Sequence, residues 1–322
     1  MRNLFNLLVC SALLGLWPVL GVAQDGEIVG EQVQLSTDMG DLHGTLLIPE
    51  TEKAPPVVFI HPGSGPTDRD GNNPMMKNNS LKYLAEALYR QGIASLRIDK
   101  RGIAESADVG PGSEADLRFE HYVNDAADWM TWLGERENLG SVIALGHSEG
   151  SLITMLASQK ADVAGYISLA GPGRPADQIL RDQLAAQGPS LTEMTDPILD
   201  FLLAGKTVED VNPMLASLFR PSVQPYLISW FKYDPAAAVK KLDFPILIIN
   251  GTTDIQVPAS EAEILAEAAS SAELVIIEGM NHILKEAPAD RMANIATYSD
   301  PELPLIEELV ASITAYVNSI GQ

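Results

Sequence analysis

Cysteine is nearly absent from this chain. Cys10 is its one cysteine, and it falls within the apolar segment that opens the sequence. The rest of the chain therefore has no residue that could form a disulfide, a thiolate metal site or a cysteine nucleophile. A chain so poor in cysteine suits an oxidising compartment.

Basic residues are also few. The 21 lysines and arginines are outnumbered by 43 aspartates and glutamates, which gives a formal net charge of −22 at pH 7. A strongly acidic surface repels nucleic acid and anionic membranes and favours solubility. We therefore expect no nucleic-acid partner. Beyond the N-terminus, no apolar run approaches the roughly 20 residues needed to span a bilayer.

The first two dozen residues have the composition of a secretory signal peptide. Arg2 supplies a positive charge, residues 4–20 are mostly apolar, and Gly21, Val22 and Ala23 end the segment with small side chains. A retained membrane anchor is disfavoured because polar residues and a proline interrupt the apolar run. We expect cleavage near Ala23 and export of residues 24–322 to the periplasm or the medium, with no membrane span in the mature chain.

Strand-like and helical runs alternate along the remaining sequence, which predicts an α/β fold with a mostly parallel sheet covered by helices on both faces. An antiparallel pair near 33–35 and 42–48 precedes it. From 172 to 241 the patterns are helical without a strand, so we expect one domain carrying a helical cap insertion there. The expected strands and helices are 57–60, 93–98, 142–145, 163–169, 245–250 and 274–277, and about 81–89, 121–133, 150–157, 259–269 and 303–317.

The pentapeptide Gly146-His147-Ser148-Glu149-Gly150 matches the pattern G-x-S-x-G and occurs once. An ordinary glycine-rich turn between a strand and a helix could also produce this pattern. Here an apolar strand enters the pentapeptide and a helical run leaves it, as a nucleophile elbow requires. The sequence therefore predicts that Ser148 is a nucleophile whose hydroxyl is exposed above the sheet.

A serine hydroxyl needs a base to take its proton. In sheets with such an elbow the catalytic residues follow the order serine, acid, histidine. Of the five histidines, only His282 lies after Ser148. It closely follows the expected strand 274–277, at the sheet edge where ligand groups gather in parallel sheets. His282 is therefore the predicted base.

Several aspartates lie between Ser148 and His282, and Asp254 is the predicted acid. It follows the expected strand 245–250 by a short turn, so it should lie at the same sheet edge as His282. Asp243 precedes that strand and would lie at the wrong end. Glu261 or Glu263, on the following helix, is the second choice.

The oxyanion of an acyl-transfer reaction needs hydrogen-bond donors. One predicted donor is the backbone amide of Glu149, directly after the nucleophile at the start of a helix. The second should come from the glycine-rich loop 61–72. We expect the amide of Ser64, with that of Gly63 as the alternative.

Five motifs appear in order along the chain. They are Gly-Ser-Gly-Pro-Thr-Asp-Arg-Asp-Gly-Asn at 63–72, Asp-Lys-Arg-Gly at 99–102, the pentapeptide at 146–150, Asn-Gly-Thr-Thr-Asp at 250–254 and Gly-Met-Asn-His at 279–282. Together they resemble those of a group of exported bacterial α/β-hydrolases described as carboxylesterases. The resemblance covers nearly all of the mature chain and implies hydrolysis of short acyl esters, a helical cap over the site, a small ester substrate and no cofactor; we expect no metal either. Pro62 departs from the shorter loop of many relatives, which leaves the second oxyanion donor open.

Two rival functions stay open. A peptidase of the same fold could anchor an amine on acidic residues of the insertion, which are Glu193, Asp196, Asp200, Glu209 and Asp210. A non-catalytic binding module is the other rival, although such proteins usually lose a triad residue.

Two further groups of residues have open roles. Asp70, Asp99 and Arg101 either contact substrate or, as we favour, form ion pairs that brace loops. The insertion is expected to form an acyl or alcohol pocket. Some of its aromatic residues should line that pocket, whereas most should only pack the insertion onto the sheet: Phe219, Tyr226, Trp230 and Phe231.

Overall fold

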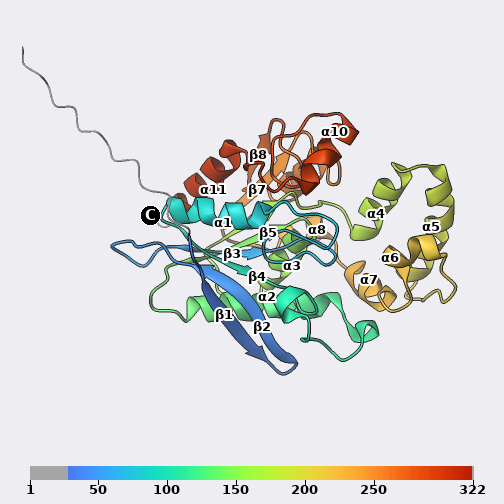
Figure 1. Ribbon diagram of the computed structural model, residues 1–322, viewed down its shortest axis with the longest axis horizontal. Coiled ribbons are helices and arrows are strands. Elements are labelled where there is room, and N and C mark those ends of the chain that lie inside the picture. The colour runs from blue at the N-terminus through green and yellow to red at the C-terminus, as the bar shows by residue number, and fades with distance from the viewer. Residues whose placement is uncertain (1–27, 321–322) are drawn as a thin grey trace, which may run out of the picture.

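The computed structural model describes residues 28–320 (Figure 1). The predicted signal peptide, residues 1–23, lies outside the described residues. None of the helices in the described part combines the length and the apolar character needed to cross a bilayer.

One eight-stranded sheet organises the molecule, in the order β1-β2-β4-β3-β5-β6-β7-β8. The pairs β1–β2 and β2–β4 are antiparallel, and all other neighbours are parallel. The predicted α/β class with a mostly parallel sheet is therefore confirmed. The strands are β1 (Glu31–Thr37), β2 (Gly40–Leu47), β3 (Val57–His61), β4 (Ala94–Ile98), β5 (Val142–His147), β6 (Gly165–Leu169), β7 (Ile246–Gly251) and β8 (Glu273–Ile277).

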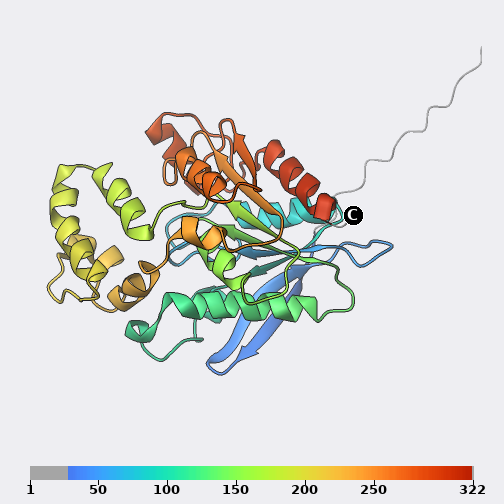
Figure 2. The same cartoon turned by 180° about the vertical axis from the view of Figure 1, so that it is seen from behind.

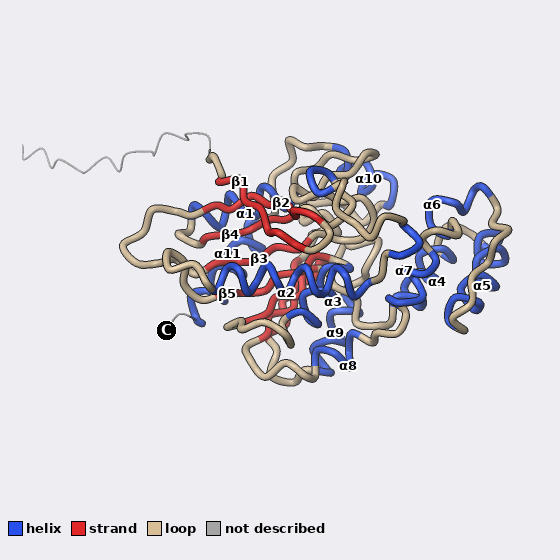
Figure 3. The backbone as a smooth tube through the Cα atoms, turned by 90° about the horizontal axis from the view of Figure 1, so that it is seen from below, coloured by secondary structure: helices blue, strands red, loops and turns tan. Residues whose placement is uncertain are grey.

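The central strands are apolar throughout because both faces of the sheet are covered. Along β3, Val57 and Phe59 face one apolar core, whereas Val58 and Ile60 face the other. The helices α2 (Phe119–Gly134), α3 (Glu149–Ala157) and α9 (Ala259–Ala268) cover the first face. The helices α1 (Ser80–Arg90) and α11 (Glu307–Ile320) cover the second (Figures 1 and 3).

Between β6 and β7 the chain forms five α-helices and one 3₁₀ turn, and no strand occurs in residues 172–241. The α-helices are α4 (Ala176–Ala185), α5 (Pro189–Leu203), α6 (Ala216–Phe219), α7 (Gln224–Trp230) and α8 (Pro235–Val239). The first four lie together beside the sheet layers, and the views from front and back agree on this (Figures 1 and 2). A short loop, residues 170–175, leads into α4, so the insertion begins at the carboxyl end of β6.

Aromatic side chains attach the insertion to the main domain. The ring of Trp230 on α7 stacks on that of Phe119 on α2, with centroids 5.9 Å apart, and Tyr226 lies 6.1 Å from the same ring. Phe219, Tyr226 and Phe231 are buried, and Trp230 is half-buried. These aromatic residues therefore pack within the insertion and against α2. The buried side chains of Phe219, Tyr226 and Phe231 have little exposed surface left to contact a ligand.

Candidate active site

Ser148 occupies the sharp turn between β5 and α3. Its backbone has φ 55° and ψ −124°, a conformation that costs a non-glycine residue about 1–3 kcal/mol. Hydrogen bonds hold the turn in place: the Ser148 amide donates to the Leu169 carbonyl at 2.9 Å, and the Ser151 amide donates to the Ser148 carbonyl at 3.0 Å. The side chain stays half-exposed. The turn thus presents the Ser148 hydroxyl at the carboxyl edge of the sheet.

The turn depends on two glycines because backbone segments meet there at contact distance. A methyl group built on Gly146 would lie 2.0 Å from the Gly150 carbonyl oxygen. One built on Gly150 would lie 2.5 Å from the carbonyl oxygen of Pro62. The first turn of α3 therefore touches both its own strand and the loop after β3. This contact fixes Ser148 against that loop.

Asp254 and His282 are in contact, although they follow different strands. The Nδ1 atom of His282 lies 2.7 Å from Oδ2 of Asp254, and both residues are more than nine-tenths buried. The other carboxylate oxygen accepts from the amides of Gln256 at 2.8 Å and Val257 at 2.9 Å. An ionised carboxylate only accepts, so Nδ1 carries the proton and Nε2 is left as a base. This is the tautomer that general-base catalysis needs.

Glu261, the second choice for the acid, is held elsewhere. Its carboxylate accepts from the amides of Gly173 and Arg174 at 3.0 and 3.1 Å and pairs with the Arg174 guanidinium. All its described partners belong to the segment that follows β6. Asp254 is thus the carboxylate that contacts His282.

His147, which the sequence offered only as part of the pentapeptide, contacts His282. Its Nε2 atom donates to the His282 carbonyl oxygen at 2.8 Å, and the two rings lie 4.9 Å apart. Burial lowers the pKa of His147 to about 3, with a further contribution from His282. The ring is therefore neutral near pH 7, and its proton is on Nε2 because a carbonyl oxygen can only accept.

The loop after β3 reaches the elbow at Gly63. A methyl group built on Gly63 would lie 3.1 Å from Cβ of Ser148. Ser64, the next residue, is exposed, and Glu149 begins α3 with its amide at the positive end of the helix. The predicted oxyanion donors therefore lie on the two segments that flank Ser148.

A buried charged cluster, which sequence reasoning missed, lies behind these donors. Lys100 is 2% exposed, and its Nζ donates to the carbonyl oxygens of Gly63 and, at 2.9 Å, Gly65. The same atom lies 4.0 Å from Oε2 of Glu149, whose Oε1 accepts from the Tyr226 hydroxyl at 2.5 Å. We name Lys100, Glu149 and Tyr226 the buried triplet. Two sequence signals pointed to it: a charged residue inside the elbow, and a lysine just after β4.

Burial shifts the pKa of both ionisable groups that pair in the triplet, Lys100 and Glu149. Burial lowers the pKa of Lys100, and the Glu149 carboxylate raises it. Burial also raises the pKa of Glu149, which Lys100 and the Tyr226 hydroxyl oppose. Each ionised group therefore depends on the other, because an unpaired buried charge is costly.

Comparison with known proteins identifies the family. Residues 57–296 match the family model described as "Alpha/beta hydrolase family". The chain belongs to the alpha/beta hydrolase family. It is similar to Esterase EstD of Thermotoga maritima, at 29% identity over 271 residues, which cover 78% of this chain and 61% of that esterase. It is also similar to a non-heme haloperoxidase of Rhodococcus erythropolis, at 25% identity over 63% of this chain and 80% of that protein.

Solved structures share the fold of this hydrolase. Est1E from Butyrivibrio proteoclasticus with ferulic acid bound superposes with a TM-score of 0.60 at 16% identity, covering 89% of this chain and 99% of Est1E. The Pyrococcus furiosus esterase Pf2001 gives 0.55 at 14% identity, covering 91% of this chain and 93% of that esterase. The predicted α/β-hydrolase fold is confirmed by these superpositions.

Arg101 lies apart from Asp70 and Asp99 in this hydrolase, since those two carboxylates line one hollow together with Arg69 and Arg97. Asp99 pairs with Arg69 at 2.5 Å, Asp70 pairs with Arg97, and Arg101 pairs with Asp125. Arg69 lies on the loop after β3, and Asp125 lies on α2. These pairs connect β4 and its loop to neighbouring segments, as the ion-pair interpretation expected.

No metal site is evident in the part of the hydrolase that the structure describes, where no three His, Cys, Asp or Glu side chains gather as ligands.

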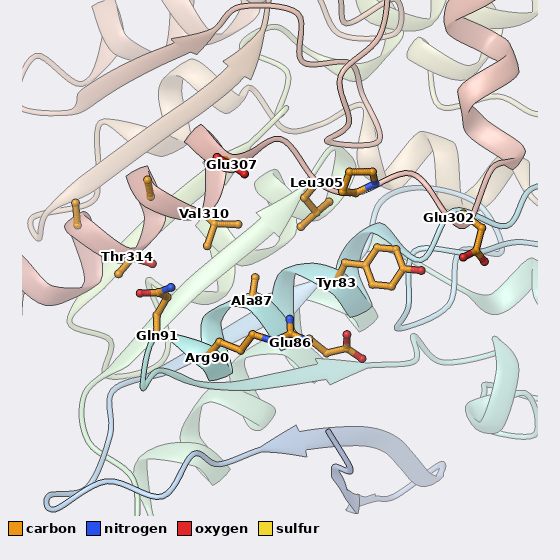
Figure 4. A pocket seen from close by; sticks show the side chains of 13 residues that line it. Tyr83, Glu86, Ala87, Arg90, Gln91, Glu302, Leu305, Glu307, Val310 and Thr314 are labelled. Atoms are coloured by element: carbon orange, nitrogen blue, oxygen red, sulfur yellow. The ribbon is translucent and has the colours of Figure 1, made fainter. Parts of the chain in front are cut away.

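A hollow of about 830 Å³ lies away from the triad, between α1 and α11 (Figure 4). Tyr83, Ala87, Leu305 and Val310 are among the residues that line it. None of Ser148, Asp254 and His282 does.

We expect Gly146→Ala to destabilise the hydrolase, because its new methyl group would overlap the Gly150 carbonyl. Overpacking costs 1–3 kcal/mol or more, so the free energy of unfolding should fall by about 3 kcal/mol. Gly134→Ala is the matched control: Gly134 ends α2 with nothing within 4 Å of an added Cβ. That change should leave stability equal or raise it by up to about 1 kcal/mol. Urea unfolding of both variants checks this, and equal effects would contradict the close contact.

Acid should destabilise the fold through two buried histidines. Burial, aided by Lys100, lowers the pKa of His61 to about 3, and burial lowers that of His147 to about 3. Unfolded histidines titrate near 6.5, so between these values the unfolded chain binds more protons and stability falls as the pH falls. Each histidine should remove about 2 kcal/mol between pH 7 and pH 5.

Replacing one of these histidines removes its share of that loss. The drop in unfolding free energy from pH 7 to pH 5 should be smaller by about 2 kcal/mol in His61→Gln than in the wild type. Urea unfolding of both proteins at both pH values measures this difference. The carboxylates titrate alike in the two proteins, so their contribution cancels when the two drops are compared. A drop of the same size in both proteins would mean that His61 titrates normally in the fold.

Proposed function

We propose that this alpha/beta hydrolase cleaves carboxylic esters, with short acyl chains, through an acyl-enzyme on Ser148. The observation that carries the proposal is the 2.7 Å contact of His282 Nδ1 with Asp254, which leaves Nε2 as the base. The likeness to Esterase EstD supports ester chemistry. Because the match spans 61% of that esterase, its activity serves here as support for a proposal.

The proposed reaction has two steps. Ser148 Oγ attacks the ester carbonyl while His282 Nε2 takes its proton, and Asp254 stabilises the imidazolium that results. The amide of Glu149 and that of Ser64, or of Gly63, bind the oxyanion. The C–O bond to the alcohol then breaks, and the alcohol leaves with the proton from His282. Water, deprotonated by the same nitrogen, attacks the acyl-enzyme, releases the acid and restores Ser148.

The helices of the insertion, residues 172–241, are proposed to act as a cap that shapes the acyl or alcohol pocket. Tyr226 on α7 bonds to Glu149, the residue next to the nucleophile, so α7 lies close to the elbow. Among the aromatic residues expected in the pocket, Trp230 is the one that is only half-buried. We therefore propose Trp230, in preference to Phe219, Tyr226 or Phe231, as the cap residue that contacts substrate.

The acidic residues of the insertion favour an esterase over a peptidase. Arg181 pairs with Asp196 at 2.8 Å and with Asp200 at 2.6 Å, so each of these exposed carboxylates already has a cationic partner. The remaining three candidates, Glu193, Glu209 and Asp210, are exposed to solvent. A solvated carboxylate binds an amine weakly, since exposed ion pairs contribute about 0–1 kcal/mol.

Ser148→Ala and His282→Ala should each abolish turnover of p-nitrophenyl butyrate while the fold remains intact. Triad residues act as a unit, and each loss should lower kcat by about 10⁴ to 10⁶. Circular dichroism and urea unfolding check the fold. Folded Ser148→Ala with activity within tenfold of wild type would rule out Ser148 as the nucleophile. Wild-type protein that cleaves aminoacyl anilides faster than the butyrate ester would instead overturn the esterase assignment.

A further inference from the structure

We propose that the buried triplet of Lys100, Glu149 and Tyr226 positions the oxyanion-binding amides and links them to the seating of α7. The inference rests on the proposed function, because it assigns a role in ester hydrolysis to three side chains that touch neither substrate nor the reacting atoms. None of the three is a member of the catalytic triad. All three are more than nine-tenths buried.

Lys100 sets the direction of the Ser64 amide. In a trans peptide the carbonyl and the following N–H point in opposite directions, and no described peptide bond is cis. Nζ of Lys100 binds the Gly63 carbonyl, so the N–H of Ser64 points away from Lys100. The Ser64 amide donates to no acceptor within residues 28–320, and it adjoins Gly63, which packs on Ser148. Lys100 therefore holds a free donor in a fixed orientation.

The second bond of Lys100 stops the loop from rotating. The Gly65 carbonyl also accepts from Nζ, at 2.9 Å. Between these two anchors, the Ser64 carbonyl accepts from the Thr67 hydroxyl at 2.8 Å. Successive carbonyls of this loop are thus held individually. Because an oxyanion donor stabilises charge only at hydrogen-bond distance, this rigidity bears directly on the rate.

Glu149 keeps the ammonium group in place. A buried ammonium needs charge compensation, and Glu149 is the carboxylate that lies 4.0 Å from it. The backbone of Glu149 carries the other predicted oxyanion donor. One residue thus supplies a donor through its amide and supports the second donor through its carboxylate. Loss of its charge should disturb the loop as well as the elbow.

Tyr226 connects the triplet to the insertion. Its hydroxyl donates to Glu149 at 2.5 Å, and its ring packs on Phe119 and Tyr122 of α2, with centroids 6.1 and 5.6 Å apart. Nζ of Lys100 lies 5.6 Å from the centroid of the Tyr122 ring. While α7 packs against α2, the Glu149 carboxylate therefore contacts both Tyr226 and Lys100. Departure of α7 would leave the carboxylate with Lys100 alone.

The test compares Lys100→Met, Glu149→Gln and Tyr226→Phe with a matched control. Tyr233→Phe removes the same chemical group, because the Tyr233 hydroxyl donates to Glu120 at 2.9 Å outside the site. Removing an oxyanion donor lowers kcat by about 10²–10³, so a misaligned donor should lower it by about 10- to 100-fold in Lys100→Met. Glu149→Gln and Tyr226→Phe should lose about three- to tenfold, and Tyr233→Phe less than twofold.

The split between kcat and KM distinguishes positioning from general destabilisation. The oxyanion forms in acylation and in deacylation, so kcat should fall while KM stays within about threefold. A trifluoromethyl ketone, which forms an anionic adduct with Ser148, provides a second readout. Its Ki should rise in each variant by the factor by which kcat/KM falls, because both report binding of the same anion.

Folded Lys100→Met with unchanged kcat, or with a lowered kcat and an unchanged Ki, would overturn the proposal. If Lys100→Met does not fold, Tyr226→Phe decides by the same two readouts, with Tyr233→Phe as its control. Failure of the proposed function gives a different pattern, in which wild-type protein lacks ester turnover or Ser148→Ala retains it. Wild-type turnover that depends on Ser148 but not on the triplet sinks this inference alone.

Discussion

The close approach of α3 to β5 is the contact on which the whole site depends. Gly146 and Gly150 leave no room for side chains, so the backbone turns sharply at Ser148 and takes a positive φ. That turn exposes the serine and places the Glu149 amide at the start of a helix. It also brings the carbonyl of Pro62 against Gly150. Ser148, the start of α3 and the loop after β3 thus share one packing constraint.

Parallel strands then deliver the remaining groups to the same edge. The segments after β3, β5, β7 and β8 carry Gly63, Ser148, Asp254 and His282, because parallel strands end on one side. The edge is held rigid by buried polar contacts. His147 donates to the backbone of His282, and Lys100 binds the carbonyls of Gly63 and Gly65. Each buried polar group in this set has a partner, which low-dielectric surroundings require.

Sequence patterns could predict the sheet and the strand ends, but not the partners of buried polar groups. Alternating apolar runs define the strands, and chain order leaves His282 as the one histidine after Ser148. The role of Lys100 depends on backbone carbonyls of a loop some 35 residues away, which no side-chain pattern records. Tyr226 was expected either to line a pocket or to pack the insertion onto the sheet, and no sequence pattern showed that its hydroxyl donates to Glu149. The sequence grouped Asp70, Asp99 and Arg101 as charged residues near the active site, but each of them pairs with a different residue.

The central claim is that His282, held by Asp254, activates Ser148. Labelling with a fluorophosphonate probe, followed by peptide mass spectrometry, tests it most directly, because only an activated serine reacts with the probe at a useful rate. The account predicts one phosphonylated residue in the folded protein, Ser148, and labelling that slows by orders of magnitude in His282→Ala. A label on a different serine, or equal labelling rates with and without the His282 imidazole, would contradict it.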